Sequence, residues 1–93
     1  MKVKEMVKSG SLESSDLLVM ITPLTEGEGL KLEINSIVKK QYGDRIRDIV
    51  MEVLNESELE DSLILIQDRG ALDYAIKSRV ETALSRIRNK EEW

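Results

Sequence analysis

The sequence predicts an α+β fold: a single two-layer sandwich in which two helices cover a small, mostly antiparallel sheet. Three short apolar segments, 17–21, 30–35 and 62–67, have the composition of strands. Two longer segments, 38–54 and 72–87, repeat apolar residues every three or four positions, as amphipathic helices do. With 93 residues, of which 41% are apolar, the chain has the size of one domain with a small core, and no internal repeat divides it.

The N-terminal segment, residues 1–16, is polar and lacks a regular period. The residues that break the period are Ser9, Gly10, Ser11, Ser14 and Ser15. We predict a flexible, mobile N-terminal arm over 1–16, with at most a short strand around Val3 to Val7.

The two segments that follow the arm predict a β-hairpin. Leu17 to Ile21 form a dense apolar run that ends at Pro23, which favours a buried strand. Residues 30–35 alternate between aliphatic and polar side chains, the period of a half-buried strand. The connection between them contains Gly27 and Gly29 and is typical of a turn.

The first helix is predicted to follow Ser36, which is a plausible N-cap. Its apolar face consists of Val38, Tyr42, Ile46, Ile49, Val50, Val53 and Leu54. Gly43 interrupts this pattern and costs a helix about 1 kcal/mol relative to alanine. Either Gly43 permits a close backbone contact, or the helix kinks or restarts there with Asp44 as a second cap; we lean to the second alternative.

The C-terminal half predicts one more strand and one more helix. An acidic connection, residues 55–61, leads into the apolar strand at 62–67, and Asp68-Arg69-Gly70 turns the chain into the last helix. The apolar face of that helix is Leu72, Ile76, Val80, Ala83, Leu84 and Ile87. The predicted order is therefore β-β-α-β-α. A right-handed crossover places the strand at 62–67 beside the strand at 17–21.

Composition limits the chemistry that this chain can perform. It contains no histidine and no cysteine. A nucleophilic serine needs an adjacent base, most often histidine, so a Ser-His-Asp triad is excluded and we expect no catalytic residues. The same composition argues against a site for zinc or another transition metal.

Charge and hydropathy point to a protein that docks on other proteins. The 14 basic and 18 acidic residues give a net charge of −4, which argues against nucleic acid or an anionic membrane as the partner. No apolar run approaches the roughly 18 residues of a membrane span, and no signal-peptide core follows the N-terminus. We expect a cytoplasmic protein.

The segment before the first strand contains two adjacent serines, Ser14 and Ser15, beside acidic residues. Because no base is available, a serine here is expected to accept a covalent group rather than to attack a substrate. Three sequence blocks occur in order along the chain: Leu12-Glu13-Ser14-Ser15-Asp16, Lys40-Gln41-Tyr42-Gly43-Asp44 and Asp68-Arg69-Gly70-Ala71-Leu72-Asp73. With these blocks the chain closely resembles the acyl carrier protein (gamma subunit) of bacterial citrate lyase, from Met1 to about Arg88.

The sequence departs mildly from the pattern of that family. Tyr42 stands where phenylalanine is expected, Arg69 where lysine is usual, and Tyr74 where the family often has cysteine. The tail from Asn89 to Trp93 carries no matched motif.

The resemblance implies a definite carrier function. The family's carrier bears a covalent 2'-(5''-phosphoribosyl)-3'-dephospho-coenzyme A group, joined to a serine by a phosphodiester; the matching position here is Ser14, directly after Leu12-Glu13. Acetyl and citryl groups are held as thioesters on the terminal thiol. The implied partners are the alpha subunit (acyl transferase), the beta subunit (citryl lyase) and the transferase that attaches the prosthetic group.

A second serine motif and two rival functions need to be weighed. Asp61-Ser62-Leu63 is the tripeptide on which ordinary acyl and peptidyl carrier proteins hold phosphopantetheine, but there it opens a helix, whereas here it leads into a strand. We therefore interpret Ser62 as structural. The rival functions are the carrier subunit of malonate decarboxylase, which uses a similar prosthetic group, and a plain protein-interaction module with a ferredoxin-like sheet.

Overall fold

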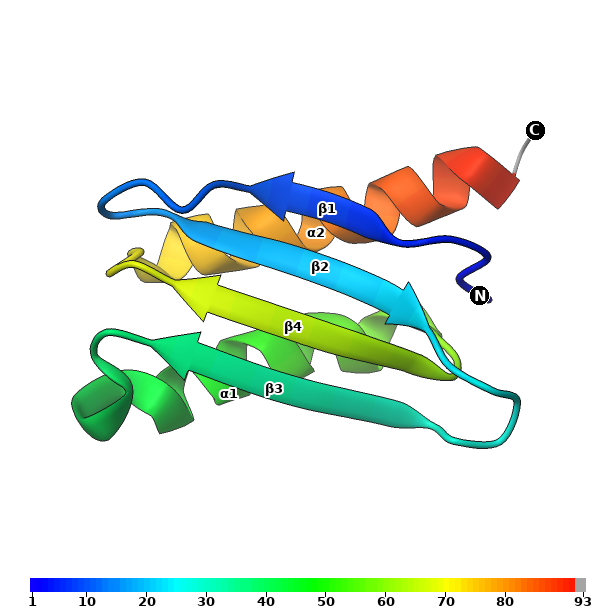
Figure 1. The fold of residues 1–93 in the computed structure, drawn as a ribbon, viewed down its shortest axis with the longest axis horizontal. Coiled ribbons are helices and arrows are strands. Elements are labelled where there is room, and N and C mark those ends of the chain that lie inside the picture. The colour runs from blue at the N-terminus through cyan, green and yellow to red at the C-terminus, as the bar shows by residue number, and fades with distance from the viewer. Residues whose placement is uncertain (92–93) are drawn as a thin grey trace.

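The computed structural model describes residues 1–91 and contains four strands and two helices (Figure 1). In chain order the elements are β1 (Val7–Gly10), β2 (Leu17–Pro23), β3 (Leu30–Ser36), α1 (Lys39–Ser57), β4 (Ser62–Asp68) and α2 (Asp73–Glu91). The α+β class and the two-layer arrangement are as predicted. The order is β-β-β-α-β-α, because the chain has one strand more than the sequence analysis expected.

The sheet has the strand order β1-β2-β4-β3. β2 is antiparallel to β1 and to β4, whereas β3 and β4 are parallel and are connected through α1. The prediction that the strand at 62–67 lies beside the strand at 17–21 is confirmed, since β4 pairs with β2. The predicted hairpin is wrong, because β4 is inserted between β2 and β3 and separates them.

The strand sequences explain why β4, and not β3, lies beside β2. Leu63-Ile64-Leu65-Ile66 is apolar on both faces and has a neighbouring strand on each side. β3 carries Lys31 and Glu33 on one face, and charged side chains are common on edge strands. The sheet therefore has its most apolar strands in the centre.

The extra strand, β1, comes from the segment that was predicted as a mobile arm. Val3 and Val7 are buried in the core, and residues 7–10 alternate between buried and exposed side chains. This segment pairs with β2 in the register Val7↔Ile21 to Gly10↔Leu18. This strand was not predicted because its serine and glycine residues interrupt the apolar alternation that indicates a strand. The arm is thus part of the sheet up to Gly10, and its mobility stays a prediction for the loop beyond.

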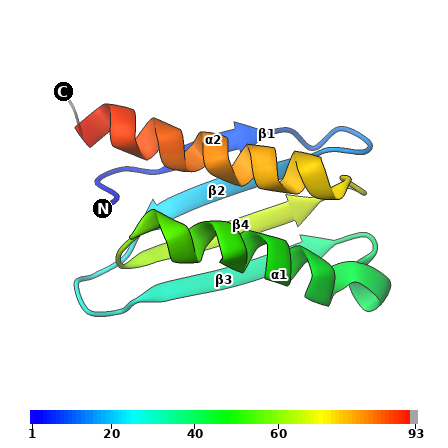
Figure 2. The ribbon, with the colours of Figure 1, turned by 180° about the vertical axis from the view of Figure 1, so that it is seen from behind.

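Both helices cover the same face of the sheet and stand in front of it in Figure 2, where α1 packs on β3 and α2 packs on β1 and β2. The core between the layers is aliphatic; its fully buried large side chains include Leu17, Ile21, Leu54, Ile64, Ile66 and Ile76. α1 is continuous through Gly43, so no restart at Asp44 occurs. Val38 occupies the N-cap position of α1, and the predicted cap Ser36 instead ends β3 and accepts a hydrogen bond from the Val38 N–H at 3.1 Å.

Candidate attachment site on the β1–β2 loop

Ser14 lies in the loop that joins β1 to β2, residues 11–16. Its side chain is exposed, and within residues 1–91 its hydroxyl has no hydrogen bond or ion pair with another group. Ser15 follows it with a positive φ of 63°, and the Asp16 N–H closes the turn on the Glu13 carbonyl at 3.2 Å. The hydroxyl of Ser14 thus stands at the outer tip of a tight turn.

The base of this loop is fixed by Asp16. Its carboxylate accepts a hydrogen bond from the Ser11 hydroxyl at 2.6 Å and one from its neighbour Leu17 N–H at 2.8 Å. Arg79 of α2 donates two further hydrogen bonds, one to each carboxylate oxygen, at 3.0 and 2.8 Å. This two-pronged geometry is the strong form of an arginine–carboxylate pair.

The charge state of Asp16 follows from these contacts. The hydrogen bonds from Arg79, with those from Ser11 and the Leu17 N–H, lower the pKa of Asp16 to about 2. The pKa of the Arg79 guanidinium is raised by the same pair. Sequence reasoning did not connect these two residues, since 63 positions separate them and neither shows a local motif. Only the fold brings them together.

A second loop, between β4 and α2, is bonded to the serine loop. The Ser15 N–H donates to the Arg69 carbonyl at 2.8 Å, and the Arg69 N–H donates to the Asp16 carbonyl, also at 2.8 Å. This reciprocal pair continues the β2–β4 ladder past its last register pair, Leu17↔Asp68. Two of the three sequence blocks, 12–16 and 68–73, are therefore held side by side.

Gly10 makes this close approach possible at the start of the loop. Its φ is +91°, a conformation that residues with a side chain rarely adopt. A Cβ at this position would lie 1.9 Å from the carbonyl oxygen of Leu17. Only glycine therefore allows the end of β1 to lie this close to the backbone of β2. The Ser11 N–H donates to the same Leu17 carbonyl at 3.0 Å.

The third block, 40–44, opens α1 at the same end of the molecule (Figure 1). Tyr42 and Leu72 line a groove of about 370 Å³ between the start of α1 and the β4–α2 loop. At its edge Arg45 donates to the Asp73 carboxylate, with 2.5 Å between Nη2 and Oδ2, and the pair is exposed to solvent. All three blocks thus meet at one end, which we call the motif end and define by residues 11–16, 37–44 and 68–74.

Ser62 has a different environment. It is fully buried at the first position of β4, and its hydroxyl donates to the Glu60 carbonyl at 2.5 Å. The structure confirms that this tripeptide leads into a strand rather than a helix. A buried, bonded hydroxyl cannot be reached by a modifying enzyme unless the strand end opens.

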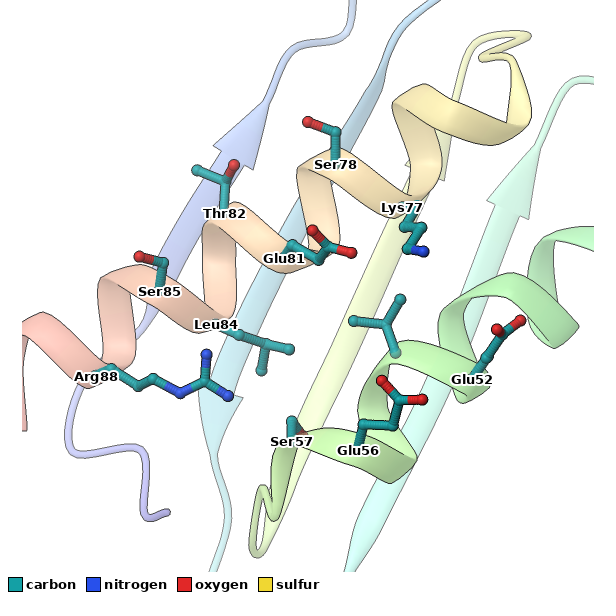
Figure 3. Close-up of a pocket in the computed structure, with 11 residues that line it drawn as sticks. Glu52, Glu56, Ser57, Lys77, Ser78, Glu81, Thr82, Leu84, Ser85 and Arg88 are labelled. Atoms are coloured by element: carbon teal, nitrogen blue, oxygen red, sulfur yellow. The ribbon is translucent and has the colours of Figure 1, made fainter.

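A larger surface groove lies elsewhere, between α1 and α2, and has a volume of about 550 Å³ (Figure 3). Its walls carry opposite charges, with Glu52 and Glu56 on α1 and Lys77 and Arg88 on α2. No ion pair spans it among the described residues, and no group of three acidic side chains there is placed to hold a metal ion. The groove has the character of a solvated surface. Within residues 1–91 no helix is long and apolar enough to cross a membrane.

The geometry defines what the motif end can do chemically. Ser14 presents an exposed hydroxyl that no base contacts by a hydrogen bond within residues 1–91, and the anchored loop fixes the position of that hydroxyl. Such a hydroxyl could accept a group that an enzyme transfers to it. This is the arrangement that the attachment site of a carrier requires.

Comparison with known proteins agrees with this class. Residues 4–87 match the model of the acyl carrier protein (ACP) family that is described as "Malonate decarboxylase delta subunit". A citrate lyase acyl carrier protein of Edwardsiella ictaluri is 42% identical over 86 residues, which cover 92% of this chain and 87% of the relative. One of Treponema denticola is 43% identical over 90 residues, covering 97% of this chain and 100% of the relative.

The fold is also similar to a solved structure. One chain of the crystal structure of a Pseudomonas malonate decarboxylase hetero-tetramer in complex with malonate has a TM-score of 0.77 at 20% identity, covering 94% of this chain and 88% of that one. The class is therefore that of small acyl carrier proteins, which do not catalyse a reaction themselves. Within it, this chain belongs to the family of citrate lyase acyl carrier proteins.

Proposed function

We propose that this protein is the acyl carrier subunit of citrate lyase and that Ser14 bears its prosthetic group. In this proposal it carries acetyl and citryl groups as thioesters during the cleavage of citrate to acetate and oxaloacetate. One observation supports it most: the only block that offers an exposed, unbonded serine is gathered at one end with the other two family blocks. The relatives named above carry the same function in their names.

The residues around Ser14 fit a covalently attached phosphoribosyl dephospho-coenzyme A group. The loop tip projects into solvent, so a large group can be joined there without displacing core side chains. The ion pair of Asp16 and Arg79 fixes the base of the loop, so the prosthetic group is attached at a fixed position. When bound, the group supplies the terminal thiol that this cysteine-free chain lacks and on which acyl groups are held.

The attachment step assigns a simple role to Ser14. Its Oγ forms a new bond to the phosphorus of a donor that carries a phosphoanhydride. The phosphoanhydride bond at that phosphorus breaks, and the phosphate part that is not transferred leaves with the electron pair. The proton of the hydroxyl passes to a base of the loading enzyme, because the chain itself has no histidine. Ser14 is thus an acceptor, and Asp16 and Arg79 act as positioning residues.

The proposed partners follow from this role. The alpha subunit exchanges acetyl for citryl on the carrier and the beta subunit cleaves the citryl group, while a separate transferase loads Ser14. Tethering keeps the acyl group at high effective concentration near both active sites. The proposal places this complex in the cytoplasm.

Intact mass spectrometry of the protein from its native host, grown by citrate fermentation, tests the proposal. A mass increase equal to the phosphoribosyl dephospho-coenzyme A group on the peptide that contains Ser14 is expected. An unmodified chain in cells that actively cleave citrate would favour the interaction module.

A second candidate is the carrier subunit of malonate decarboxylase, which the description of the matching family and the similar fold both favour. The two functions share the attachment chemistry and differ in the acyl group. Acyl analysis of the loaded protein separates them: acetyl exchanged for citryl in the presence of citrate indicates citrate lyase, and malonyl indicates the decarboxylase.

A further inference from the structure

The large apolar side chains that remain exposed are concentrated at the motif end. Within residues 1–91 the exposed large hydrophobic residues are Met6, Leu12, Leu30, Ile37, Tyr42, Leu72 and Tyr74. Five of these seven belong to the motif end; the other two, Met6 and Leu30, directly precede or begin β1 and β3, at the opposite end of the sheet. We call the five, Leu12, Ile37, Tyr42, Leu72 and Tyr74, the motif-end patch.

The exposure of these side chains is large and is not needed for folding. Ile37 is 67% exposed, Leu72 62% and Tyr74 74%. The core is built entirely from aliphatic side chains, yet both described tyrosines stand on the surface at this end. Exposed apolar clusters of this kind mark sites where another protein binds, and tyrosine is among the residues that contribute most to the binding energy at such sites.

Contacts tie the patch to the loop that bears Ser14. Tyr42 and Leu72 line the same groove, whose floor includes Gly70. Ile37 borders Gly70 as well, since a Cβ on that glycine would lie 3.8 Å from Ile37 Cδ1. The residue before Gly70, Arg69, exchanges hydrogen bonds with Ser15 and Asp16. The apolar surface therefore begins directly beside the serine loop.

We propose that the motif-end patch is the docking surface for the enzyme that loads Ser14. This inference rests on the proposed function. The position of the patch selects this enzyme among the partners. A loading enzyme must bring the Ser14 hydroxyl itself into its active site, so it has to cover the surface next to that residue. Enzymes that act on the acyl group meet it at the far end of a long arm, so their chemistry does not require that the surface beside Ser14 be covered.

The partner's surface follows from the chemistry of the patch. It presents a rim of apolar side chains around its active-site entrance, with one of them placed to enter the groove of about 370 Å³ between Tyr42 and Leu72. The exposed pair of Arg45 and Asp73 at the groove edge offers both charges for hydrogen bonds at the interface rim.

Binding of the apo protein to the purified loading enzyme, measured by calorimetry, tests the proposal. The double variant Ile37→Ser/Leu72→Ser is expected to raise Kd by about tenfold or more, because central apolar contacts dominate protein interfaces. In the loading reaction, the KM of the loading enzyme for the apo form of this double variant should be higher than for the wild-type protein, while kcat stays similar. The matched control Met6→Ser/Leu30→Ser removes two exposed apolar residues at the opposite end and should change Kd by about twofold at most.

Two further measurements keep the outcomes distinct. Thermal unfolding shows that each variant is folded, and Ser14→Ala should bind the enzyme with wild-type affinity although it cannot be loaded. If the wild-type protein binds the enzyme but never gains the mass of the prosthetic group, the proposed function is wrong, whereas the docking role of the motif-end patch is still supported. If Ile37→Ser/Leu72→Ser is loaded with the same KM as the wild type, the inference about the docking surface is wrong, whereas the proposed function is unaffected. Self-association of the apo protein that Leu72→Ser abolishes would also overturn it, since a second copy would then cover the patch.

Discussion

Two serines of this chain, Ser14 and Ser62, lie in motifs that carrier proteins use, and the structure gives them opposite environments. Ser14 is exposed at the tip of a turn, and its hydroxyl is unbonded within the described residues. Ser62 is fully buried at the start of a central strand, and its hydroxyl is bonded to Glu60. The comparison teaches that a short motif identifies an attachment site only when the fold presents its hydroxyl to solvent.

Ser14→Ala should have the largest effect of any change at either serine. We expect complete loss of prosthetic-group attachment and of lyase activity, with stability within about 0.5 kcal/mol of wild type, because an exposed loop hydroxyl contributes little to folding. Intact mass and denaturant unfolding measure both quantities. Attachment to a Ser14→Ala protein would refute the assignment.

The adjacent Ser15 provides a sharp control. Its φ of 63° suits glycine, so Ser15→Gly should keep most of the attachment and activity, with the Ser15 N–H bond to Arg69 retained. Peptide mapping of the loaded protein by fragmentation decides between the neighbours. If the prosthetic group were found on Ser15, then Ser15 and not Ser14 would be the attachment site.

Asp16→Asn should weaken the anchor of the Ser14 loop. The folded pKa of Asp16, about 2, lies below its ordinary value of 3.8, so the ionised form stabilises the fold above pH 4. That contribution is lost as the pH falls from about 4 to about 2. We expect it to be on the order of 1 kcal/mol, less than the pKa shift alone implies, because Arg79 is partly exposed and solvent screens the pair.

Unfolding of wild type and variant at several pH values checks this prediction. The difference in unfolding free energy should be greatest near neutral pH and should shrink steadily as the pH falls from about 4 towards 2. A constant difference across this range would mean that the ion pair does not anchor the loop.

Ser62→Ala should leave loading and lyase activity near wild type while lowering stability by about 1 kcal/mol, the usual cost of losing one buried hydrogen bond. Mass spectrometry and unfolding separate the two effects. Loss of loading in a protein that is still folded would restore Ser62 as the attachment site and remove the contrast with Ser14.

Amide exchange measures the smallest expected effect, which concerns mobility within the serine loop. The sequence predicted a flexible arm, and the structure restricts the expectation to the tip. The amides of Ser11 and Ser15 donate to the carbonyls of Leu17 and Arg69, so they should exchange more slowly than the amides of Leu12 and Ser14, for which no such bond is formed among the described residues. Strong protection across the whole of Gly10 to Ser15 would contradict a mobile tip.

Much of the fold could be read from periodicity alone. The face of α2 with Ile76, Val80 and Ile87 is buried as the spacing predicts. The apolar runs of β2 and β4 are also strands. These elements are predictable because their burial imposes a regular pattern on the sequence. β1 could not be predicted in this way, because Ser9 and Gly10 interrupt any apolar alternation in its sequence. Gly10 is there because it packs closely against the backbone of β2.

The sequence by itself indicated the candidate serine, because the block around Ser14 is contiguous, and it excluded a Ser-His-Asp triad, because the chain contains no histidine. The tertiary structure alone decided the strand order, because pairing depends on which apolar surfaces meet and not on chain order. It also decided the anchor of the loop. Asp16 meets Arg79 across 63 residues, and Ser15 meets Arg69, since only the folded sheet and its covering helix bring those segments within hydrogen-bond distance.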